Sequence, residues 1–261
     1  MLPNVQLREI FHFLFLKELL RRSDPKLYVL KGGVNLRFFF GSPRYSEDMD
    51  LDVRIAAVNT LKKNGFKILN DRVFLLGLST YGVEKVEVRD PQKLKQTETT
   101  QRFKAQLIRS SGETLSTRIE FSRRLRSPGS PDTDIQIDRI DPAIASRFQQ
   151  LPYRCQHYSG PAMIYQKVEA LAGRNQPQCR DVFDLFLLYQ KGLLTSLDSK
   201  DRLSVQTLKA ASQKLSALTF KDFEGQVLEF LDPHDRDEYG SKSVWNEIQK
   251  KIDGFLQGKS A

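Results

Sequence analysis

The sequence predicts an α/β (α+β) fold, in which a mixed-sheet core is followed by a helical C-terminal region. Short β-prone runs separated by polar turns fill much of the first 140 residues. Apolar residues recur at helical spacing in residues 3–22 and again from Gly160 onward. The chain has 261 residues, enough for one large domain or two modest ones. We therefore expect a core at residues 1–150 and a helical region at residues 151–261.

The elements of the expected core are predicted from local patterns. A helix over residues 3–22 ends at the Ser-Asp-Pro stretch that begins at Ser23. Residues 56–65 are expected to be helical, with Gly65 as the C-terminal cap. Residues 141–160 are expected to be irregular. Strands are predicted at residues 28–30, 48–55, 66–69, 83–88, 103–107, 115–121 and 135–140.

The C-terminal part is predicted to be a series of helices. Pro161 is a good first-turn residue, and a second helix is expected to begin at Arg180. Residues 233–240 are polar and are predicted to form a turn. Further helices are predicted at residues 203–218 and 223–231. A last helix carries an apolar stripe that we interpret as core, formed by Trp245, Ile248, Ile252 and Phe255.

Three aspartates alternate with apolar residues in the strand predicted at residues 48–55. Asp48, Asp50 and Asp52 point to one face, because residues two apart in a strand share a face. Aspartate is depleted in strands and neighbouring like charges repel, so a positive group is expected beside them. Mg²⁺, which binds carboxylates and substrate phosphates, is the most economical candidate. A solvated strand face is the alternative, and Asp52 in particular either joins the site or faces water.

A Gly-Gly pair lies between the strand at residues 28–30 and a short apolar helix. Gly32 and Gly33 free backbone amides at this strand-to-helix turn, where the positive end of the helix also favours anions. A Gly-Gly turn alone is a weak signal, but one just upstream of an Asp-x-Asp strand is stronger. The sequence therefore predicts a phosphate-binding turn beside a metal site.

The basic excess lies in the part of the chain that carries these motifs. The net charge is +9, and residues 195–261 hold 10 basic and 11 acidic residues, so residues 1–194 hold 31 basic and 21 acidic ones. Such a field favours polyanions, and we expect nucleic acid as a partner. A basic surface that only confers solubility is the alternative.

Composition also limits which cellular compartment and which kinds of metal site are to be expected. No apolar run approaches the ~20 residues of a membrane span, so we expect a cytoplasmic protein that has no membrane partner. Cys155 and Cys179 lack the spacing of a zinc site and are expected to be reduced and structural. The three histidines are scattered and give no metal signature, and His12 within the first helix is interpreted as structural.

The motifs together resemble a known enzyme family. The residues KGGVNLR at 31–37 and RYSEDMDLD at 44–52 are similar to the signature of the AbiEii-type nucleotidyltransferase toxins, in the polymerase β-like nucleotidyltransferase superfamily. Family members often carry Ser or Thr after the second Gly, where this chain has Val34, so one phosphate-binding hydroxyl is missing. The resemblance implies metal ligands at Asp48 and Asp50 and nucleotide-binding residues at Gly32, Gly33, Arg44 and Ser46.

The resemblance also implies a third metal-binding carboxylate on a neighbouring strand. Glu120, in the strand predicted at residues 115–121, is the candidate. An exposed glutamate paired with Arg118 is the alternative, since strand alternation alone does not tell which face meets the metal. Several arginines at this strand could bind the phosphates of an RNA or a nucleotide, or form a solvated strand end: Arg118, Arg123, Arg124 and Arg126.

A lysine and an Arg-Asp-x-x-Asp helix complete the resemblance. The family commonly carries both, and the matching positions here are Lys167, Arg180, Asp181 and Asp184. A lysine can neutralise triphosphate charge, and a nearby aspartate can orient it or activate an acceptor hydroxyl. We therefore assign catalytic roles to Lys167 and Asp181 and a nucleotide contact to Lys167, leaving the role of Asp184 open. A helix-surface salt bridge is the alternative.

By this resemblance the chain is expected to be a nucleotidyltransferase toxin of a bacterial toxin–antitoxin or phage-defence system. Two Mg²⁺ ions on the catalytic residues Asp48, Asp50 and Glu120 are expected to clamp the attacking and leaving oxygens. The expected substrates are an NTP and an RNA acceptor, with the tRNA 3′ end favoured, and the expected partner is a cognate antitoxin protein. Two alternatives remain open: NMP transfer to a protein hydroxyl, and a non-catalytic binding module that retains the fold.

Overall fold

The computed structural model describes residues 2–54, 58–88, 97, 99–123, 134–195 and 203–258. It contains two compact units. The first comprises Met1–Phe39 and Tyr45–Tyr158, and the second comprises Phe40–Arg44 and Ser159–Ala261. The predicted end of a strand at Ile55 and two of the basic residues, Arg124 and Arg126, lie outside the described residues.

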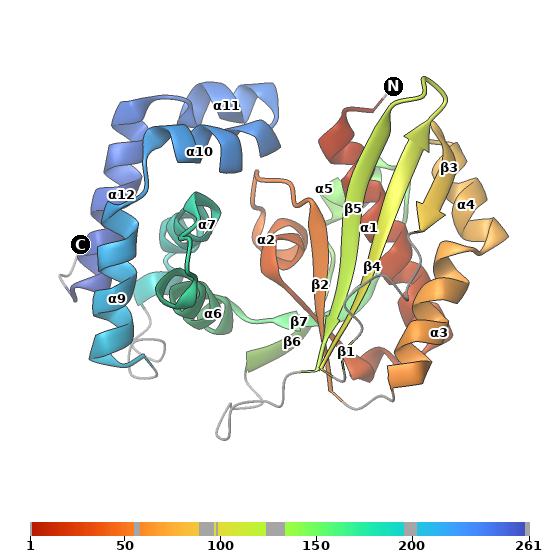
Figure 1. The fold of residues 1–261 in the computed structure, drawn as a ribbon, viewed down its shortest axis with the longest axis horizontal. Helices are drawn as coiled ribbons and strands as arrows, with labels where there is room; N and C mark the ends of the chain where they lie inside the picture. Colours follow the sequence, from red (N-terminus) through yellow and green to blue (C-terminus); the bar gives the residue numbers. More distant parts are fainter. Residues whose placement is uncertain are drawn as a thin grey trace. The chain divides into compact units, whose positions relative to one another are not determined.

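The first unit is built on a mixed sheet (Figure 1). Its described strands are β1 (Tyr28–Lys31), β2 (Asp48–Val53), β3 (Val83–Val88), β4 (Thr100–Arg109), β5 (Thr114–Ser122), β6 (Ile135–Arg139) and β7 (Arg154–Tyr158). Among the described residues these seven strands are ordered β3-β4-β5-β2-β1-β7-β6. The strand β1 runs antiparallel to β2, whereas β2 runs parallel to β5. The predicted mixed sheet is therefore confirmed.

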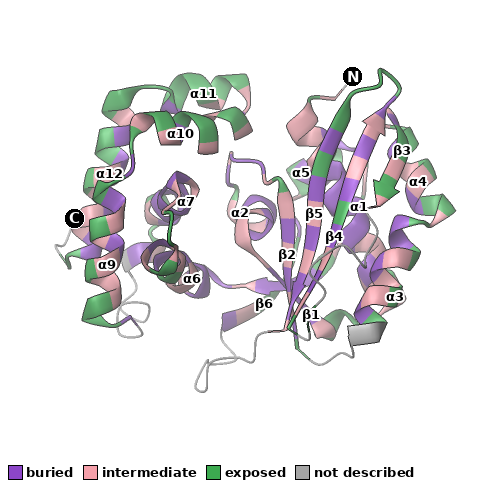
Figure 2. Ribbon diagram, viewed as in Figure 1, coloured by how far each residue is buried: buried purple, intermediate pink, exposed green. Residues whose placement is uncertain are grey.

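Helices cover the apolar face of this sheet. The helical elements of the first unit are α1 (Asn4–Arg22), η1 (Pro25–Leu27), α2 (Gly32–Phe40), α3 (Val58–Leu69), α4 (Arg72–Ser79) and α5 (Pro142–Arg147). Met49, Leu51 and Val53 of β2 are buried in one core cluster with residues of α1, α3 and α4. The aspartates between them are only half-buried, so the alternation predicted for β2 is confirmed (Figure 2). The acidic face is the side of the sheet turned away from this core.

The prediction of a helix end at Gly65 and a strand at residues 66–69 is wrong. The helix α3 continues through Gly65 to Leu69. Phe103 of β4 lies so close that a Cβ at position 65 would be 2.6 Å from its ring. Phe66 also meets this ring edge-on, with centroids 5.1 Å apart. Gly65 is therefore a packing residue that lets an aromatic ring of the sheet approach the helix, and the β-prone residues after it are core residues of the same helix.

Gly65→Ala is expected to destabilise the protein by about 1–3 kcal/mol, because the added methyl group overpacks the contact with Phe103. In an open helical position the same change is neutral or stabilising, since alanine is the better helix former. Gly254, within α12 (Lys242–Leu256), has nothing within 4 Å of the place that a Cβ would occupy and supplies the matched control. Thermal unfolding of both variants checks the prediction. Equal stabilities of the two variants would contradict it.

The expectation that residues 141–160 are irregular is also wrong. Asp141 caps the helix α5 by accepting from the amide of Ala143, and Pro142 occupies its first turn. The strand β7 then enters the sheet between β1 and β6. Its Gln156 is buried and donates to the carbonyl oxygens of Pro25 and Tyr28. Polar residues whose hydrogen bonds are met inside the protein produce no apolar alternation, so the sequence pattern concealed this strand.

The second unit is helical, as predicted. Its elements are α6 (Gly160–Gly173), α7 (Cys179–Gln190), η4 (Leu193–Thr195), α9 (Val205–Ser216), α10 (Phe220–Gln226), η5 (Leu228–Phe230), α11 (Pro233–Tyr239) and α12. Trp245 stacks on Phe223 with ring centroids 4.6 Å apart, and the predicted apolar stripe of α12 is buried. Residues 233–239 form α11 rather than the predicted turn, because Pro233 occupies its first turn and Tyr239 packs edge-on against Phe183.

Two further expectations concern the cysteines and the membrane. Cys155 and Cys179 are both buried and free. Burial is the main cause that raises the pKa of each thiol to about 12, which leaves both protonated and unreactive. Among the described residues, every helix is too short or too polar to cross a lipid bilayer.

Candidate functional site

The acidic face brings together carboxylates from two strands. In the parallel pairing of β2 with β5, Asp50 lies opposite Glu120 and Asp48 lies opposite Arg118. Partners opposite each other in a sheet point to the same face, so the Asp50 and Glu120 side chains are neighbours. Three of the predicted site residues therefore share one surface of the first unit: Asp48, Asp50 and Glu120.

Arginines balance this acidic surface. Arg118 Nη2 donates to Asp48 Oδ2 at 2.6 Å, and Arg102 Nε of β4 donates to Glu120 Oε2 at 2.5 Å. Partial burial raises the pKa of Glu120, but the hydrogen bond and charge of Arg102, with the charges of Arg118 and Lys31, outweigh this and lower it. Glu120 is therefore ionised at neutral pH. Its partner is Arg102, not the Arg118 considered in the alternative interpretation.

Asp52 does not face water. Its Oδ1 accepts from Lys31 Nζ, and its Oδ2 accepts from the Tyr158 hydroxyl at 2.8 Å. Lys31 itself lies opposite Asp50 in the antiparallel pairing of β1 with β2. Asp52 and Tyr158 thus hold a lysine beside the carboxylates of Asp50 and Glu120, and both oxygens of Asp52 are engaged in doing so.

Glycine is required where the helix α2 begins. Gly32 has φ +69°, a left-handed conformation that residues with a Cβ rarely adopt. A Cβ there would also lie 3.2 Å from Asp50 Oδ2. The first turn of α2, which includes Gly33, therefore starts directly beside the Asp50 carboxylate. This position suits an anion that bridges a carboxylate-bound cation and the helix N-terminus.

Buried and partly buried hydrogen bonds set the position of the strand that carries the aspartates. The Thr117 hydroxyl donates to the Glu47 carbonyl oxygen at 2.7 Å and contacts His12 Nε2 at 2.8 Å. Burial, with the charge of a nearby arginine, lowers the pKa of His12 to about 3, so His12 is neutral and structural, as expected. Ser46, predicted to bind nucleotide, donates its hydroxyl to the Asp48 carbonyl oxygen at 2.8 Å. Both contacts fix the chain where β2 begins.

The second unit holds a buried cluster of alternating charges. Lys167 Nζ lies 3.0 Å from Asp181 Oδ1 and 2.5 Å from Asp184 Oδ2. Arg44 binds the Asp184 carboxylate through Nε and Nη2 at 3.0–3.1 Å. Arg174 Nε donates to Asp181 Oδ2 at 2.9 Å. The helix-surface salt bridge considered as an alternative is excluded by burial, since both aspartates are almost fully enclosed.

This cluster carries more positive than negative charge. Three cations surround two carboxylates, and Asp184 is shared between Arg44 and Lys167. Burial alone would raise the pKa of Asp184, but the charges of Arg44 and Lys167 and their hydrogen bonds outweigh it and lower the pKa. Asp184 is therefore ionised at neutral pH, and the excess of cationic over anionic side chains in the cluster suits a polyanionic ligand.

Comparison with known proteins decides the family. A family model described as the nucleotidyl transferase AbiEii toxin of type IV toxin–antitoxin systems matches residues 14–258. The chain belongs to the AbiEii nucleotidyltransferase toxin family. It is therefore a nucleotidyltransferase toxin, and the predicted family and enzyme class are confirmed. Membership also implies an NTP as substrate and an antitoxin as partner.

Solved structures share the fold of this AbiEii protein. MenT4, a nucleotidyltransferase toxin from Mycobacterium tuberculosis H37Rv, matches with a TM-score of 0.58 and 16% identity, covering 99% of this chain and 85% of that one. A Helicobacter pylori protein assigned as a nucleotidyltransferase matches with a TM-score of 0.54 and 16% identity, covering 100% of both chains. A search of curated proteins finds no match. At these identities the structural likeness establishes the fold, which confirms the predicted α/β class.

The donor set of the acidic face fits a divalent cation of the kind that nucleotidyltransferases use. Asp48, Asp50 and Glu120 offer only carboxylate oxygens, which are the ligands Mg²⁺ prefers. Because Gly32 leaves no Cβ beside Asp50 Oδ2, backbone and substrate can approach that oxygen closely. The assignment of these three residues as metal ligands stays a prediction.

Possible metal ligands also gather away from the acidic face, whose three carboxylates do not bring one oxygen each within 4.8 Å of one another. Across the described parts of the chain, only His234, Asp235 and Glu238 bring three such ligand atoms within 4.8 Å of one another. They lie on α11, which has seven residues, and His234 and Glu238 are exposed. Exposed acidic groups are common without an ion, so we assign this group no function.

The structure adds residues that motif reasoning did not single out. Arg102 and Tyr158 come from sequence positions far from the motifs, whereas Arg174 lies between Lys167 and Asp181, and each of the three binds a carboxylate of the site. No sequence signal distinguishes these residues from other arginines and tyrosines. Lys31 is the first residue of the motif KGGVNLR, and its position immediately before Gly32 is the sequence signal for it.

The shifted pKa of Asp184 predicts acid sensitivity. Because its folded pKa lies below the ordinary value of 3.8, its ion pairs stabilise the protein above about pH 4, and this contribution is lost as the pH falls through the folded pKa. Urea denaturation followed by the fluorescence of Trp245, the single tryptophan, is expected to show this loss as the pH is lowered below about 4. The loss should be smaller in Asp184→Asn. Equal pH dependence in both proteins would contradict the prediction.

Proposed function

We propose that this toxin is a Mg²⁺-dependent enzyme that transfers NMP from an NTP to an RNA acceptor, the 3′ end of tRNA. Its role would be that of the toxin in a bacterial toxin–antitoxin or phage-defence system, and the reaction would take place in the cytoplasm, where both substrates are found. The observation that carries the proposal is the juxtaposition of Asp50 and Glu120 on parallel strands, directly beside the Gly32 turn.

The residues of the first unit would hold metal and phosphate. Asp48, Asp50 and Glu120 would bind two Mg²⁺ ions, which supply charge that activates the acceptor hydroxyl and stabilises the leaving pyrophosphate. The backbone of Gly32 and Gly33, at the positive end of α2, would bind the phosphates. Because Val34 has no hydroxyl group, the backbone amides of this turn would bind the phosphates without one.

The residues of the second unit would hold the triphosphate. An ammonium group carries three donors, and Asp181 and Asp184 accept two of those of Lys167. Asp181 would thus orient Lys167, so that its remaining donor points to a phosphate oxygen. Arg44, which binds Asp184 in the same unit, would hold that carboxylate in place.

The charge distribution supports an RNA acceptor. Residues 1–194 carry the entire basic excess of the chain, and they include every residue of the proposed site. A positive field around the reacting groups raises the local concentration of a polyanion and speeds its association. A protein acceptor would gain this benefit only where it is acidic.

The experiment that tests this function is an incubation of the protein with each labelled NTP, Mg²⁺ and total tRNA. Label in the RNA, sensitive to RNase, is the expected result. Label in protein, resistant to RNase, would instead establish transfer to a protein hydroxyl. If no NTP gave any label, the proposal would be overturned, and the non-catalytic binding module would be the remaining interpretation. Glu87→Gln, which removes an exposed carboxylate on the edge strand β3, is the control expected to retain activity.

A further inference from the structure

Two arginines are paired with the carboxylates that we assign to the metals. Arg118 binds Asp48, and Arg102 binds Glu120, at 2.6 and 2.5 Å. The register of the sheet places each arginine directly opposite its carboxylate, so all four side chains lie on one face. A divalent cation that binds these carboxylates therefore competes with the guanidinium groups for their negative charge.

Pairs at this degree of exposure can exchange partners. The side chains of Arg102 and Arg118 are each 32% exposed, so water screens their attraction to the carboxylates. The pair between Arg44 and Asp184 differs, because it is bidentate and its side chains are 5% and 0% exposed. The arginines of the sheet can leave their carboxylates at low cost, whereas removal of Arg44 would leave the buried Asp184 carboxylate with Lys167 as its one remaining cation in the cluster.

We propose that Arg102 and Arg118 bind phosphates of the acceptor RNA once a divalent cation has taken over Asp48 and Glu120. This inference rests on the proposed function and names RNA contacts of the same site. A guanidinium group binds phosphate through parallel N–H donors. Arg118 Nε is buried and has no hydrogen-bond partner among the described residues, so this arginine has donor capacity that Asp48 does not use.

The exchange couples metal binding to RNA binding. Without metal, the carboxylates hold the arginines and repel RNA phosphates. With metal bound, the carboxylate charge is neutralised and the arginines turn to the RNA. Because such coupling is reciprocal, RNA tightens metal binding by the same factor by which the metal tightens RNA binding.

The first test measures Mn²⁺ binding by electron paramagnetic resonance, without nucleotide or RNA. Arg118→Gln and Arg102→Gln are expected to bind Mn²⁺ about three- to tenfold more tightly than the wild type, because each variant loses a competing cation beside an acidic ligand. Unchanged or weaker Mn²⁺ binding would show that the arginines only hold the carboxylates in place, and would overturn the proposal.

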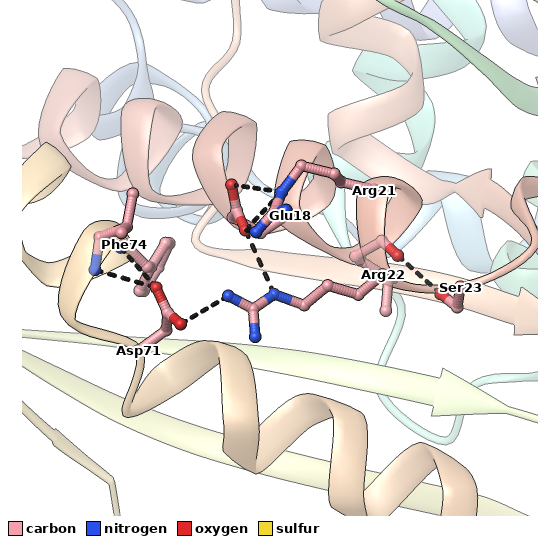
Figure 3. A network of polar contacts seen from close by, with 8 residues as sticks. Glu18, Arg21, Arg22, Ser23, Asp71 and Phe74 are labelled. Atoms are coloured by element: carbon pink, nitrogen blue, oxygen red, sulfur yellow. Dashed lines mark hydrogen bonds and ion pairs between the residues drawn. The ribbon is translucent and has the colours of Figure 1, made fainter.

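A matched control lies elsewhere in the first unit. Arg22 of α1 binds Asp71, the capping residue of α4, at 2.6 Å, and its side chain is 23% exposed (Figure 3). This pair has the same chemistry and a similar exposure, but it is not on the acidic face of the sheet. Arg22→Gln removes the same charge and is expected to leave Mn²⁺ binding at the wild-type level.

The second test measures binding of a tRNA transcript labelled with fluorescein at its 5′ end, at several salt concentrations and without NTP. Adding Mn²⁺ is expected to tighten RNA binding. It should also steepen the slope of log K against log salt concentration by roughly one unit for each released arginine. Arg118→Gln and Arg102→Gln should each lose about one unit of this slope, only when Mn²⁺ is present. A loss of the same size without Mn²⁺ would contradict the exchange.

Asp48→Asn tests the exchange from the carboxylate side. Without Mn²⁺ it is expected to bind tRNA more tightly than the wild type, because Arg118 is released. Asp71→Asn frees Nη2 of Arg22, whose Nε stays bound to Glu18, and loses the same charge, and asparagine still caps the helix. A gain equal to that of Asp71→Asn would be a general charge effect and would overturn the proposal. Adding Arg118→Gln to Asp48→Asn should remove the gain.

These binding measurements separate the exchange from the proposed function. They contain no NTP, so they do not depend on whether the RNA receives a nucleotide. If the arginine variants behave as expected while the wild type transfers no nucleotide, the proposed function fails and the exchange stands. If the wild type modifies tRNA while all variants bind Mn²⁺ and tRNA like the wild type, only the exchange fails. Circular dichroism verifies that each variant is folded.

Discussion

Asp50→Asn is expected to reduce nucleotide transfer on the order of 10³-fold while leaving the fold intact. The change keeps the size of the side chain but removes one negative charge from the proposed metal ligands. Metal ions supply several kcal/mol of transition-state stabilisation in such sites, and each ~1.4 kcal/mol is a tenfold change in rate. Asp50 lies opposite both Glu120 and Lys31, so the loss of its charge relieves one repulsion and weakens one attraction, and the melting temperature should change little.

Single-turnover assays with labelled NTP, together with thermal unfolding, check this prediction. Glu87→Gln is the control, because it removes a carboxylate from the same sheet at an exposed edge. If Asp50→Asn transferred nucleotide at the wild-type rate, the assignment of the metal ligands would be wrong. If it failed to fold, the residue would have a structural role that its half-buried position does not predict.

Asp184→Ala is expected to destabilise the second unit by about 3–5 kcal/mol. Removal of one partner from a buried ion pair leaves an uncompensated charge, and Asp184 has two cationic partners. Its side chain is fully buried, and it accepts from Arg44 in a bidentate arrangement and from Lys167 at 2.5 Å. Without the carboxylate, two cations face each other in a space with little water.

Urea denaturation followed through Trp245 reports on this unit, because that residue is buried in its core. Asp184→Asn is expected to lie between Asp184→Ala and the wild type, since the amide oxygen still accepts a hydrogen bond. Glu247→Ala, which breaks an exposed pair with Lys251 on α12, is expected to cause no measurable change. If Asp184→Ala were as stable as the Glu247 variant, the buried cluster would not be a stabilising element.

Local patterns predicted the fold wherever burial follows the period of the element. The alternation in β2 and the stripe on α12 are examples, because both elements bury one face and expose the other. The predictions failed at Gly65, where close approach of Phe103 decides the residue, and at β7, where buried polar residues find partners inside the protein. In both places a contact distant in the sequence overrides the local signal.

The candidate site likewise contains residues that local patterns predict and residues that only distant contacts bring in. Its motifs contain acidic and glycine residues at spacings that chemistry requires, so Asp48, Asp50 and the Gly32 turn could be named from the sequence. The contact of Asp52 with Tyr158 could not be predicted, because Tyr158 is 106 residues away and reaches Asp52 through the pairing of β1 with β7. The same holds for Arg102, which meets Glu120 through the pairing of β4 with β5.

The sequence by itself determined which chemical groups this toxin carries: alternating carboxylates, a glycine turn, a lysine and an Arg-Asp-x-x-Asp helix. Only the tertiary structure decided which charges are paired and how firmly. Ion-pair strength depends on burial and on partners brought in by strand register and helix packing, and these are properties of the folded chain. The pairing of the strands places a partly exposed arginine beside Asp48 and another beside Glu120, and these are the arginines that we propose to exchange. The packing of the second unit instead buries Asp184 between two fixed cations, Arg44 and Lys167.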